Sequence, residues 1–338
     1  MKYSVFRESV KLEIRKILGA DFDVRLHSAT KNNGICLWAI VIKEANKMVA
    51  PTIYLEEYYE KYVTSICDIR TIADDIIECF YKHKDDIEFD IEYFKDYDKI
   101  KSDIRCKIVN TKKNEKLLNK IPHIDFLDLS IVFYCVFSEN AENTQTCLIY
   151  NSHLTMWSIE PNDLYKIAVE NTMKFNKYEI KPIGDIINEL IDSKKTYELT
   201  GKSCEQEVRK NERLETKKTE GYDDGKTEEE QLRNVLIKEI NESEFPMFVL
   251  TNKRRLFGAV CILYKDLLKK IAEILDNDFY ILPSSIHEII LVPYKSNESS
   301  EMYKNIVADV NMHEVFREEV LSDNVYQYCR SEEQIILL

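Results

Sequence analysis

Residues 193–232 limit the fold of this 338-residue chain more than any other segment. They read SKKTYELTGKSCEQEVRKNERLETKKTEGYDDGKTEEEQL, which is charged and polar almost throughout. So few apolar side chains cannot form a core that offsets the conformational entropy lost on ordering. The segment therefore predicts a flexible charged linker, helical in places through Glu/Lys pairs, that divides the chain into blocks.

The block before residue 85 shows the pattern of a small α+β unit, 1–84. Apolar residues recur at helical spacing over 4–18, and Gly19 ends that run. Asn33-Gly34 lies between two strand-like runs and predicts a two-residue hairpin turn, because that turn needs positive φ angles. The stretch PTIYLEEYY then predicts a third strand that leads into helical sequence.

Two further blocks, 85–192 and 233–338, alternate between strand and helix patterns. In the first, DLSIVFYCVF and TQTCLIYNSHLTMW predict paired strands, and a helix follows with Pro161 in its first turn. In the second, FPMFVLT, DFYILPSS and HEIILVPY predict strands, and LFGAVCILYKDLLKKIAEILDN predicts a helix. Together the blocks predict an α+β fold with mixed or antiparallel sheets, packed helices and two to three subdomains.

The charge and the cysteines indicate a compartment and argue against some partners. Nine cysteines without a CxxC pair are typical of a reducing cytoplasm, and no stretch approaches the ~20 apolar residues of a membrane span. A formal charge of −13 argues against direct nucleic-acid binding. The acidic run 85–98, DDIEFDIEYFKDYD, leaves open an acidic mimic of nucleic acid beside the simpler interpretation of a solvated face.

The first cluster that suits chemistry is YNSHLTMW, predicted to lie at a strand end. Asn151, His153 and Trp157 would line a pocket there, and histidine is the usual acid or base near neutral pH. A polar strand terminus, with Trp157 in the core, is the structural alternative.

The second cluster is TNKRRLFGA, between a predicted strand and a predicted helix. Its four polar residues precede a helix start that contains Gly258; they are Asn252, Lys253, Arg254 and Arg255. A helix N-terminus with adjacent cations suits a phosphate or a carboxylate. The pattern lacks the GxxxxGK[ST] of a P-loop, and an exposed loop with solvated charges is the alternative.

The third cluster lies within YILPSSIHEIILVPY, at residues 280–294. Its polar residues are Ser284, Ser285, His287 and Glu288. On a strand, Ser285 and His287 would face one side and could form a hydrogen bond. No GxSxG elbow is present, so a hairpin turn, a binding surface and a covalent catalyst all stay open.

Metal and cofactor signals are weak. His123, Asp125 and Asp128 lie close together in PHIDFLD, but no HExxH or Cys/His ladder accompanies them. No GxGxxG is present among only seven glycines, which disfavours a dinucleotide. We therefore expect neither a metal nor a cofactor.

Several of these segments together resemble a bacterial family known as domain of unknown function, family 5688. They are PTIYLEEYY, IPHIDFLDLSIVFY, NSHLTMWSI, PMFVLTNKRRLFGA, LPSSIHEIILVP and LSDNVYQY, so the resemblance covers about residues 24–330. It implies a cytoplasmic bacterial accessory protein, of a kind often encoded on mobile elements. It implies no activity and no catalytic residue.

Two functions follow as hypotheses. The first is a non-enzymatic binding or regulatory protein of a bacterial accessory or mobile-element system, in defence or counter-defence, that binds a protein partner or a small anionic ligand. The second is a hydrolase-type enzyme on an anionic substrate, with His153 and His287 as acid and base and Lys253 or Arg254 holding the substrate. The second needs one cleft shared by both histidines. The lack of a complete catalytic motif favours the first.

Overall fold

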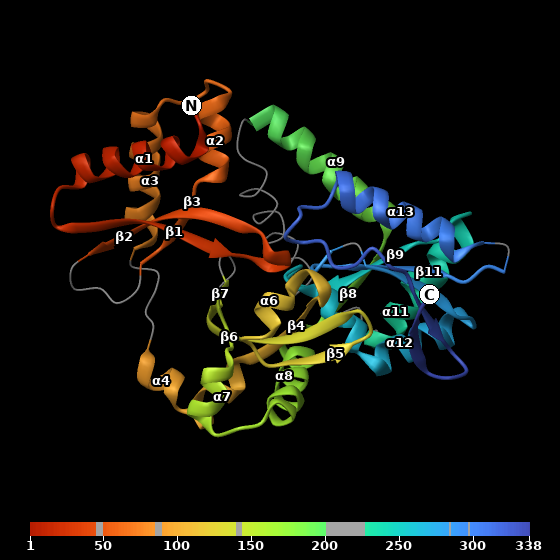
Figure 1. Ribbon diagram of the computed structural model, residues 1–338. Helices are drawn as coiled ribbons and strands as arrows, with labels where there is room; N and C mark the ends of the chain where they lie inside the picture. The colour runs from red at the N-terminus through yellow and green to blue at the C-terminus, as the bar shows by residue number, and fades with distance from the viewer. Residues whose placement is uncertain (45–49, 85–89, 140–143, 201–226, 284, 297) are drawn as a thin grey trace. The chain divides into compact units, whose positions relative to one another are not determined.

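The computed structural model of the chain describes residues 1–44, 50–84, 90–139, 144–200, 227–283, 285–296 and 298–338 (Figure 1). These residues form two compact units, 1–94 and 95–338. All the strand pairs of the described residues are antiparallel, and helices pack on the sheets, so the predicted α+β fold is confirmed.

The first unit is built on a three-stranded sheet. Its elements are α1 (Tyr3–Leu18), β1 (Phe22–Thr30), β2 (Cys36–Glu44), β3 (Thr52–Tyr54), α2 (Glu56–Val63) and α3 (Ile69–His83). Helix α1 buries Phe6, Val10 and Ile14, whose spacing places them on one face, against α3 and the sheet. The Asn33-Gly34 hairpin is confirmed, with φ angles of 59° and 69°, but its connection is a short 3₁₀-helix rather than a two-residue turn.

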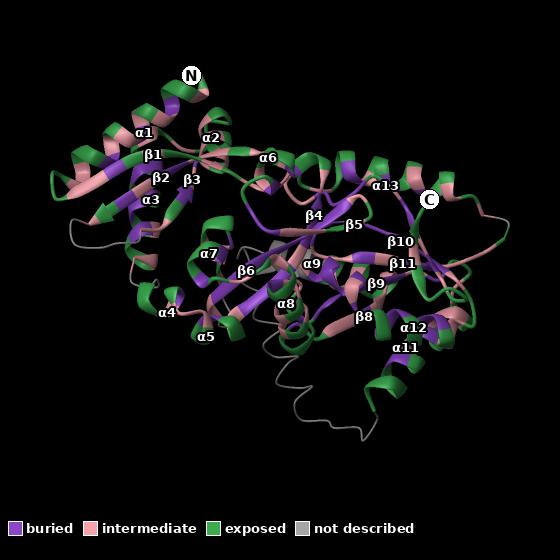
Figure 2. Ribbon diagram, turned by 60° about the horizontal axis from the view of Figure 1, so that its bottom comes forward, coloured by how far each residue is buried: buried purple, intermediate pink, exposed green. Residues whose placement is uncertain are grey.

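The second unit contains a four-stranded sheet in the order β4-β6-β5, with β7 also paired to β6. The chain before and within this part forms α4 (Ile91–Lys95), α5 (Tyr97–Ile100), β4 (Ile104–Asn110), α6 (Glu115–Leu118), β5 (His123–Phe126), β6 (Leu129–Glu139), β7 (Thr144–Leu148), α7 (Asn151–Trp157) and α8 (Pro161–Phe175). Strand β6 is the central and longest strand, and eight consecutive residues from Leu129 onward are buried (Figure 2). Pro161 begins α8, as predicted, because its missing N–H needs no partner at that position.

A six-stranded sheet completes the second unit, in the order β13-β12-β10-β11-β9-β8. Its elements are β8 (Tyr178–Pro182), α9 (Ile183–Thr200), α11 (Glu228–Glu242), β9 (Phe248–Asn252), the 3₁₀-helix η4 (Gly258–Leu263), α12 (Lys265–Leu275), β10 (Phe279–Leu282), β11 (Ile289–Pro293), α13 (Ser300–His313), β12 (Tyr326–Cys329) and β13 (Gln334–Leu337). Figures 1 and 2 show α13 on one face of this sheet and α11 with α12 on the other. Helix α13 buries Tyr303 and Val307 against β10 and β11.

The sheet joins two blocks that the sequence analysis kept apart. Strand β8 belongs to the predicted middle block 85–192, and β9 belongs to the predicted block 233–338. The two strands pair over five residues, from Tyr178↔Asn252 to Pro182↔Phe248. Of the predicted linker, the first residues continue α9 and the last begin α11, while 201–226 lie outside the described residues.

Two local expectations differ from the structure. Residues 151–157 form helix α7 rather than the end of a strand, because Leu154 and Trp157 are buried at helical spacing. The helix expected over LFGAVCILYKDLLKKIAEILDN is split: η4 comes first, and α12 begins only at Lys265. Tyr264, which lies between η4 and α12, has φ −83° and ψ 76°, outside the helical region, so the two helices are separate.

Candidate functional site

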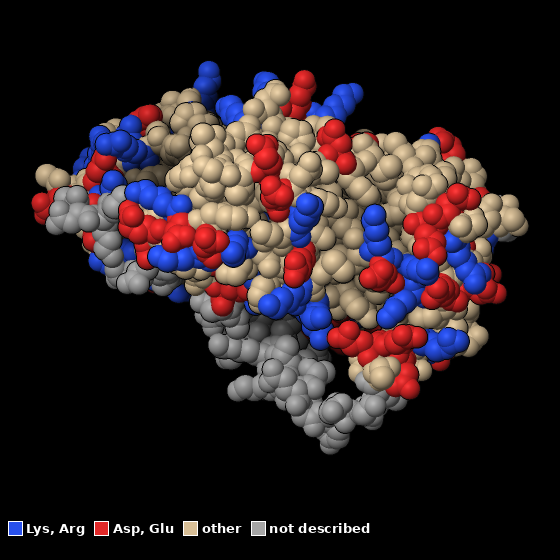
Figure 3. Space-filling view, turned by 90° about the horizontal axis from the view of Figure 1, so that it is seen from below, with Lys and Arg blue, Asp and Glu red and all other residues tan. Residues whose placement is uncertain are grey.

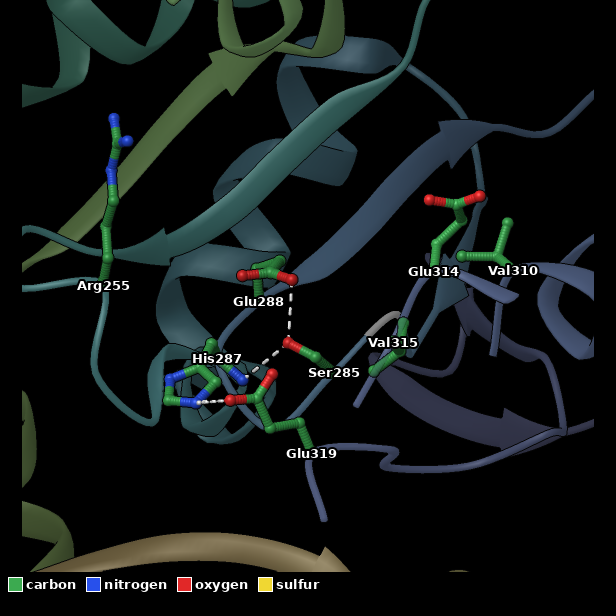
Figure 4. A pocket seen from close by; sticks show the side chains of 8 residues that line it. All are labelled: Arg255, Ser285, His287, Glu288, Val310, Glu314, Val315 and Glu319. Carbon is green, nitrogen blue, oxygen red and sulfur yellow. Dashed lines mark hydrogen bonds and ion pairs between the residues drawn. The ribbon is translucent and has the colours of Figure 1, made fainter. Parts of the chain in front are cut away.

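A pocket of about 460 Å³ lies beside the turn that joins β10 to β11 (Figure 4). Four elements contribute to it: the loop after β9, the β10–β11 turn, α13, and the segment that follows α13. Its lining residues are Arg255, Ser285, His287, Glu288, Val310, Glu314, Val315 and Glu319. Ser285, His287 and Glu288 of the third sequence cluster and Arg255 of the second therefore meet at this pocket.

The loop after β9 is held in a fixed conformation by Asn252. This buried side chain donates a hydrogen bond to the backbone oxygen of Leu256 at 2.8 Å and accepts one from the backbone N–H of Arg254 at 3.0 Å. Arg255 and Phe257 both have positive φ angles, 51° and 55°. Backbone of this kind persists where the surrounding contacts enforce it. Asn252 thus shapes the loop and is not available to a ligand.

Gly258 lets this loop pass close to the β10–β11 turn. A Cβ atom there would lie 2.1 Å from Oγ1 of Thr251 and 2.4 Å from the backbone oxygen of His287. Oγ1 of Thr251 also donates a hydrogen bond of 2.7 Å to that same oxygen. The two segments are therefore in direct contact, and only glycine fits between them.

The turn itself is organised by Ser285, whose side chain is almost fully buried. Its Oγ donates to Oε1 of Glu288 at 2.8 Å and accepts from the backbone N–H of His287 at 3.0 Å. Strand β11 resumes only at Ile289, so these residues belong to the turn. The expected serine–histidine hydrogen bond is formed by the histidine backbone and not by its ring. Ser284 lies outside the described residues.

The ring of His287 is held on both sides. Its Nδ1 accepts a hydrogen bond from the backbone N–H of Phe257 at 3.2 Å, and the two rings stack at 5.8 Å. Its Nε2 lies 3.6 Å from Oε1 of Glu319. Glu319 is fixed in turn, because its backbone oxygen accepts from the N–H of Ile286 at 2.8 Å. With Nδ1 accepting, the neutral ring carries its proton on Nε2, toward the carboxylate.

This geometry does not prepare a nucleophile. Proton abstraction from Ser285 needs a basic ring nitrogen within hydrogen-bond reach of Oγ. The Oγ hydrogen points instead to Glu288, and Nδ1 of His287 is occupied by Phe257. The contacts of Ser285 are those of a turn-forming serine.

Two cations of the second cluster, Arg254 and Arg255, form ion pairs with glutamates. Nη1 of Arg254 lies 2.7 Å from Oε1 of Glu139. Arg105 donates one hydrogen bond of 2.7 Å to each carboxylate oxygen of the same glutamate. Burial alone would raise the pKa of Glu139, but Arg105 and Arg254 outweigh it, and the pKa is lowered. Arg255 binds Glu189 at 2.8 Å and lies 3.4 Å from Glu179.

The helix N-terminus expected to bind an anion at this place is not formed. The segment after the loop is η4, and the next α-helix, α12, begins at Lys265. Lys253 is exposed beside the loop, and its backbone N–H donates to Lys177. A helix N-terminus therefore does not contribute to the predicted anion site at Asn252–Arg255.

The first cluster lies on α7 and not at the pocket. Nδ1 of His153 accepts from the backbone N–H of Tyr150 at 3.2 Å, and its ring packs on Tyr150 and Trp157. Burial lowers the pKa of His153. Trp157 is buried, whereas Asn151 is exposed. His287 lines the pocket, whereas His153 does not.

Asp128, in the PHIDFLD segment, has a structural role. Its carboxylate accepts three hydrogen bonds: from Ser322 at 2.6 Å, from Asn324 at 2.9 Å and from Tyr326 at 2.6 Å. These contacts join the turn between β5 and β6 to the start of β12. Among the described residues, no three His, Cys, Asp or Glu side chains form a group that could hold a metal ion.

The sequence matches one family over residues 3–330, described as a family of unknown function, DUF5688. The chain belongs to family DUF5688. No curated protein and no solved structure matches it. The pocket of this DUF5688 protein is thus described from its own residues.

Sequence reasoning missed half of the pocket of this DUF5688 chain. Val310, Glu314, Val315 and Glu319 line the pocket, and the sequence analysis names none of them. Apolar and acidic residues near a helix end are common, so no local sequence pattern identifies these four as pocket residues. The fold places them beside the β10–β11 turn, about 30 residues earlier in the chain.

The charged surface of this DUF5688 protein is mixed. On the face drawn in Figure 3, basic and acidic side chains are interspersed, and no continuous basic stripe crosses it. The acidic run expected to allow mimicry of nucleic acid is described only from residue 90. There Asp90 and Asp96 accept from backbone N–H groups of α4 and α5, as N-terminal carboxylates commonly do.

Within the described part of the chain, no helix is long and apolar enough to cross a membrane.

Proposed function

We propose that this protein is a non-enzymatic binding or regulatory protein, and that its pocket holds a positively charged group of the ligand. The observation that carries this proposal is the lining of the pocket. Three carboxylates line it, those of Glu288, Glu314 and Glu319, against a single guanidinium, that of Arg255. Figure 4 shows Arg255 apart from these carboxylates, and Arg255 forms ion pairs with Glu179 and Glu189.

Electrostatics favours a cation over the anionic ligand that the sequence suggested. An ammonium or guanidinium group beside these carboxylates gains attraction that an anion would lose, and the gain is larger where the site is partly desolvated. The carboxylate of Glu288 accepts a hydrogen bond from Ser285, and the carboxylate of Glu319 lies 3.6 Å from Nε2 of His287. Little side-chain entropy would then be lost when a ligand binds.

The non-enzymatic part of the proposal is supported by the contacts of the candidate catalytic groups. Ser285 has no ring nitrogen beside its Oγ, and His287 is engaged by Phe257 and Glu319. His153 belongs to another part of the fold. Hydrolysis by these residues would require the turn to be rearranged.

The cellular setting is also a proposal. A cytoplasmic location is supported by the eight cysteines among the described residues, all of which are free thiols. A role in a bacterial accessory or mobile-element system, in defence or counter-defence, rests on the family resemblance alone.

Titration with small probes tests the proposal. The probes are N-acetyl-arginine amide, spermidine and inorganic phosphate, followed through the backbone amide NMR signals of residues 285–288. We expect the two cations to shift these signals and phosphate to leave them unchanged. The double variant Glu314→Gln/Glu319→Gln should weaken cation binding about two- to thirtyfold, since each exposed charge pair contributes about 0.2–1 kcal/mol.

The matched control is Glu301→Gln/Glu332→Gln, which removes two exposed carboxylates that do not line the pocket. It should leave cation binding unchanged. Phosphate binding that is lost in Arg254→Ala would show that the site takes anions. Turnover of ester or phosphate substrates that is lost in Ser285→Ala would show that the protein is an enzyme.

A further inference from the structure

Two large apolar side chains are exposed next to the pocket. Met312 is 76% exposed and Phe316 is 71% exposed. Between them in the chain lie Glu314 and Val315, which line the pocket. Single exposed apolar residues are common, but a group of them beside a pocket is typical of a binding surface.

The exposure of Met312 and Phe316 has no role in the fold. Helix α13 buries its other face, with Tyr303, Val307 and Asn311 turned toward the protein. Met302, which is 44% exposed, lies on the same side of the helix as Met312, about 80° from it around the helix axis, whereas Ile306 lies about 120° from Met312. From residue 302 to residue 312 this face extends about 15 Å, at 1.5 Å per helical residue. That length exceeds what a small ligand covers and suits a peptide segment.

The charges around this face are mainly acidic. Asp309, Glu314, Glu318 and Glu319 lie on or just after α13, and the whole chain has a formal charge of −13. The nearby basic residues are Lys304 and Arg317, and Lys304 lies 3.9 Å from Glu301. A complementary partner therefore combines apolar side chains with Lys or Arg.

We propose that the outer face of α13 and the adjoining pocket together dock a basic amphipathic helix of a partner protein. This inference rests on the proposed function, because the pocket must accept a cation. Apolar residues of the partner contact Met302, Met312 and Phe316, and one Lys or Arg enters the pocket beside Glu314 and Glu319. Methionine side chains adapt to varied apolar partners, and aromatic side chains often contribute most at interfaces.

A lipid membrane is the other class that an exposed apolar face suits. The carboxylates of this face disfavour it, because anionic headgroups repel them. The five acidic residues on or just after α13, Glu301, Asp309, Glu314, Glu318 and Glu319, outnumber Lys304 and Arg317. Charge complementarity thus selects a basic protein segment.

Fluorescence anisotropy on the full-length protein tests the proposal. The probe is a labelled 18-residue Leu/Lys peptide with helical amphipathic spacing, and it is compared with a scrambled peptide of the same composition. At 150 mM salt we expect the amphipathic peptide to bind at least tenfold more tightly than the scrambled one. Met312→Ser/Phe316→Ser should weaken binding at least tenfold, and Glu314→Gln/Glu319→Gln should weaken it several-fold.

The control variant is Ile66→Ser/Phe245→Ser, which removes two apolar side chains that are 71% and 62% exposed elsewhere on the chain. It should bind the amphipathic peptide as the wild type does. Equal binding of the scrambled peptide, or unchanged binding by Met312→Ser/Phe316→Ser, would overturn the inference. Binding to phosphatidylcholine vesicles that is lost in that same variant would assign the face to a membrane and would also overturn it.

The small-cation titration separates the two proposals. If the Gln variant weakens cation binding but Met312→Ser/Phe316→Ser leaves peptide binding unchanged, the docking inference fails and the pocket function stands. If the Gln variant alters neither cation nor peptide binding, both fail.

Discussion

Gly258 shows how one small residue determines the geometry of the pocket. It allows the loop after β9 to touch the turn that carries His287, with Thr251 bonded to the same backbone oxygen. His287 in turn receives the backbone N–H of Phe257, the residue just before the glycine. The orientation of the histidine ring therefore depends on the absence of a side chain at position 258.

We predict that Gly258→Ala destabilises the protein by about 1–3 kcal/mol, the usual cost of forcing extra volume into a packed site. The added Cβ would have to displace Thr251 or the backbone of the turn. Urea unfolding of the full-length chain measures the loss. Gly184→Ala is the control, because no atom lies within 4 Å of its added Cβ. Equal stability of both variants would show that Gly258 does not lie as close to Thr251 and the backbone oxygen of His287 as described.

At the scale of elements, α9 is attached to the sheet by a small charge network. Oε1 of Glu189 lies 2.6 Å from Nζ of Lys181, and its Oε2 lies 2.8 Å from Nη2 of Arg255. Burial alone would raise the pKa of Glu189, but these two cations outweigh it and lower the pKa. The network joins β8, α9 and the loop that lines the pocket.

We predict that Glu189→Gln loosens α9 without unfolding the protein. Ion pairs this exposed contribute up to about 1 kcal/mol, so amide exchange in the first two turns of α9 should rise about two- to fivefold. Hydrogen–deuterium exchange read by mass spectrometry measures it, with Glu242→Gln on α11 as the control. Unchanged exchange in α9 would mean that apolar packing alone holds the helix.

Elements were predictable where local pattern and tertiary packing agree. The apolar spacing predicted helix α1, and Gly19 predicted where it ends. Asn33-Gly34 predicted the connection between β1 and β2. The segment Asn151–Trp157 was misread as strand because its short apolar pattern fits both periods. The pocket was half predictable: its turn residues are adjacent in sequence, whereas Glu314 and Glu319 reach it only through the packing of α13.

At the scale of the whole molecule, the division into units follows strand pairing rather than the charged segment. β8 and β9 lie on opposite sides of that segment and are neighbours in one sheet. Asp128 further joins the four-stranded sheet to the start of β12. Residues 95–338 therefore form one unit, and 1–94 form the other.

We predict that fragments 1–94 and 95–338 each fold alone, whereas 233–338 does not. The last fragment lacks β8, which would leave β9 as an edge strand, and it lacks the partner of Tyr326. Circular dichroism with thermal unfolding should show one cooperative transition for each of the first two fragments and none for the third. Cooperative unfolding of 233–338 would support the three-part division drawn from the sequence.

The hydrogen bonds of Asp128 also have a consequence in time. Tyr326 follows Asp128 by 198 residues. At about 5–20 residues per second on the ribosome, the carboxylate emerges roughly 10–40 s before its phenolic partner is made. During that interval water molecules, rather than Ser322, Asn324 and Tyr326, form the hydrogen bonds of the Asp128 carboxylate. The two sheets of the second unit are joined through this residue only when synthesis is nearly finished.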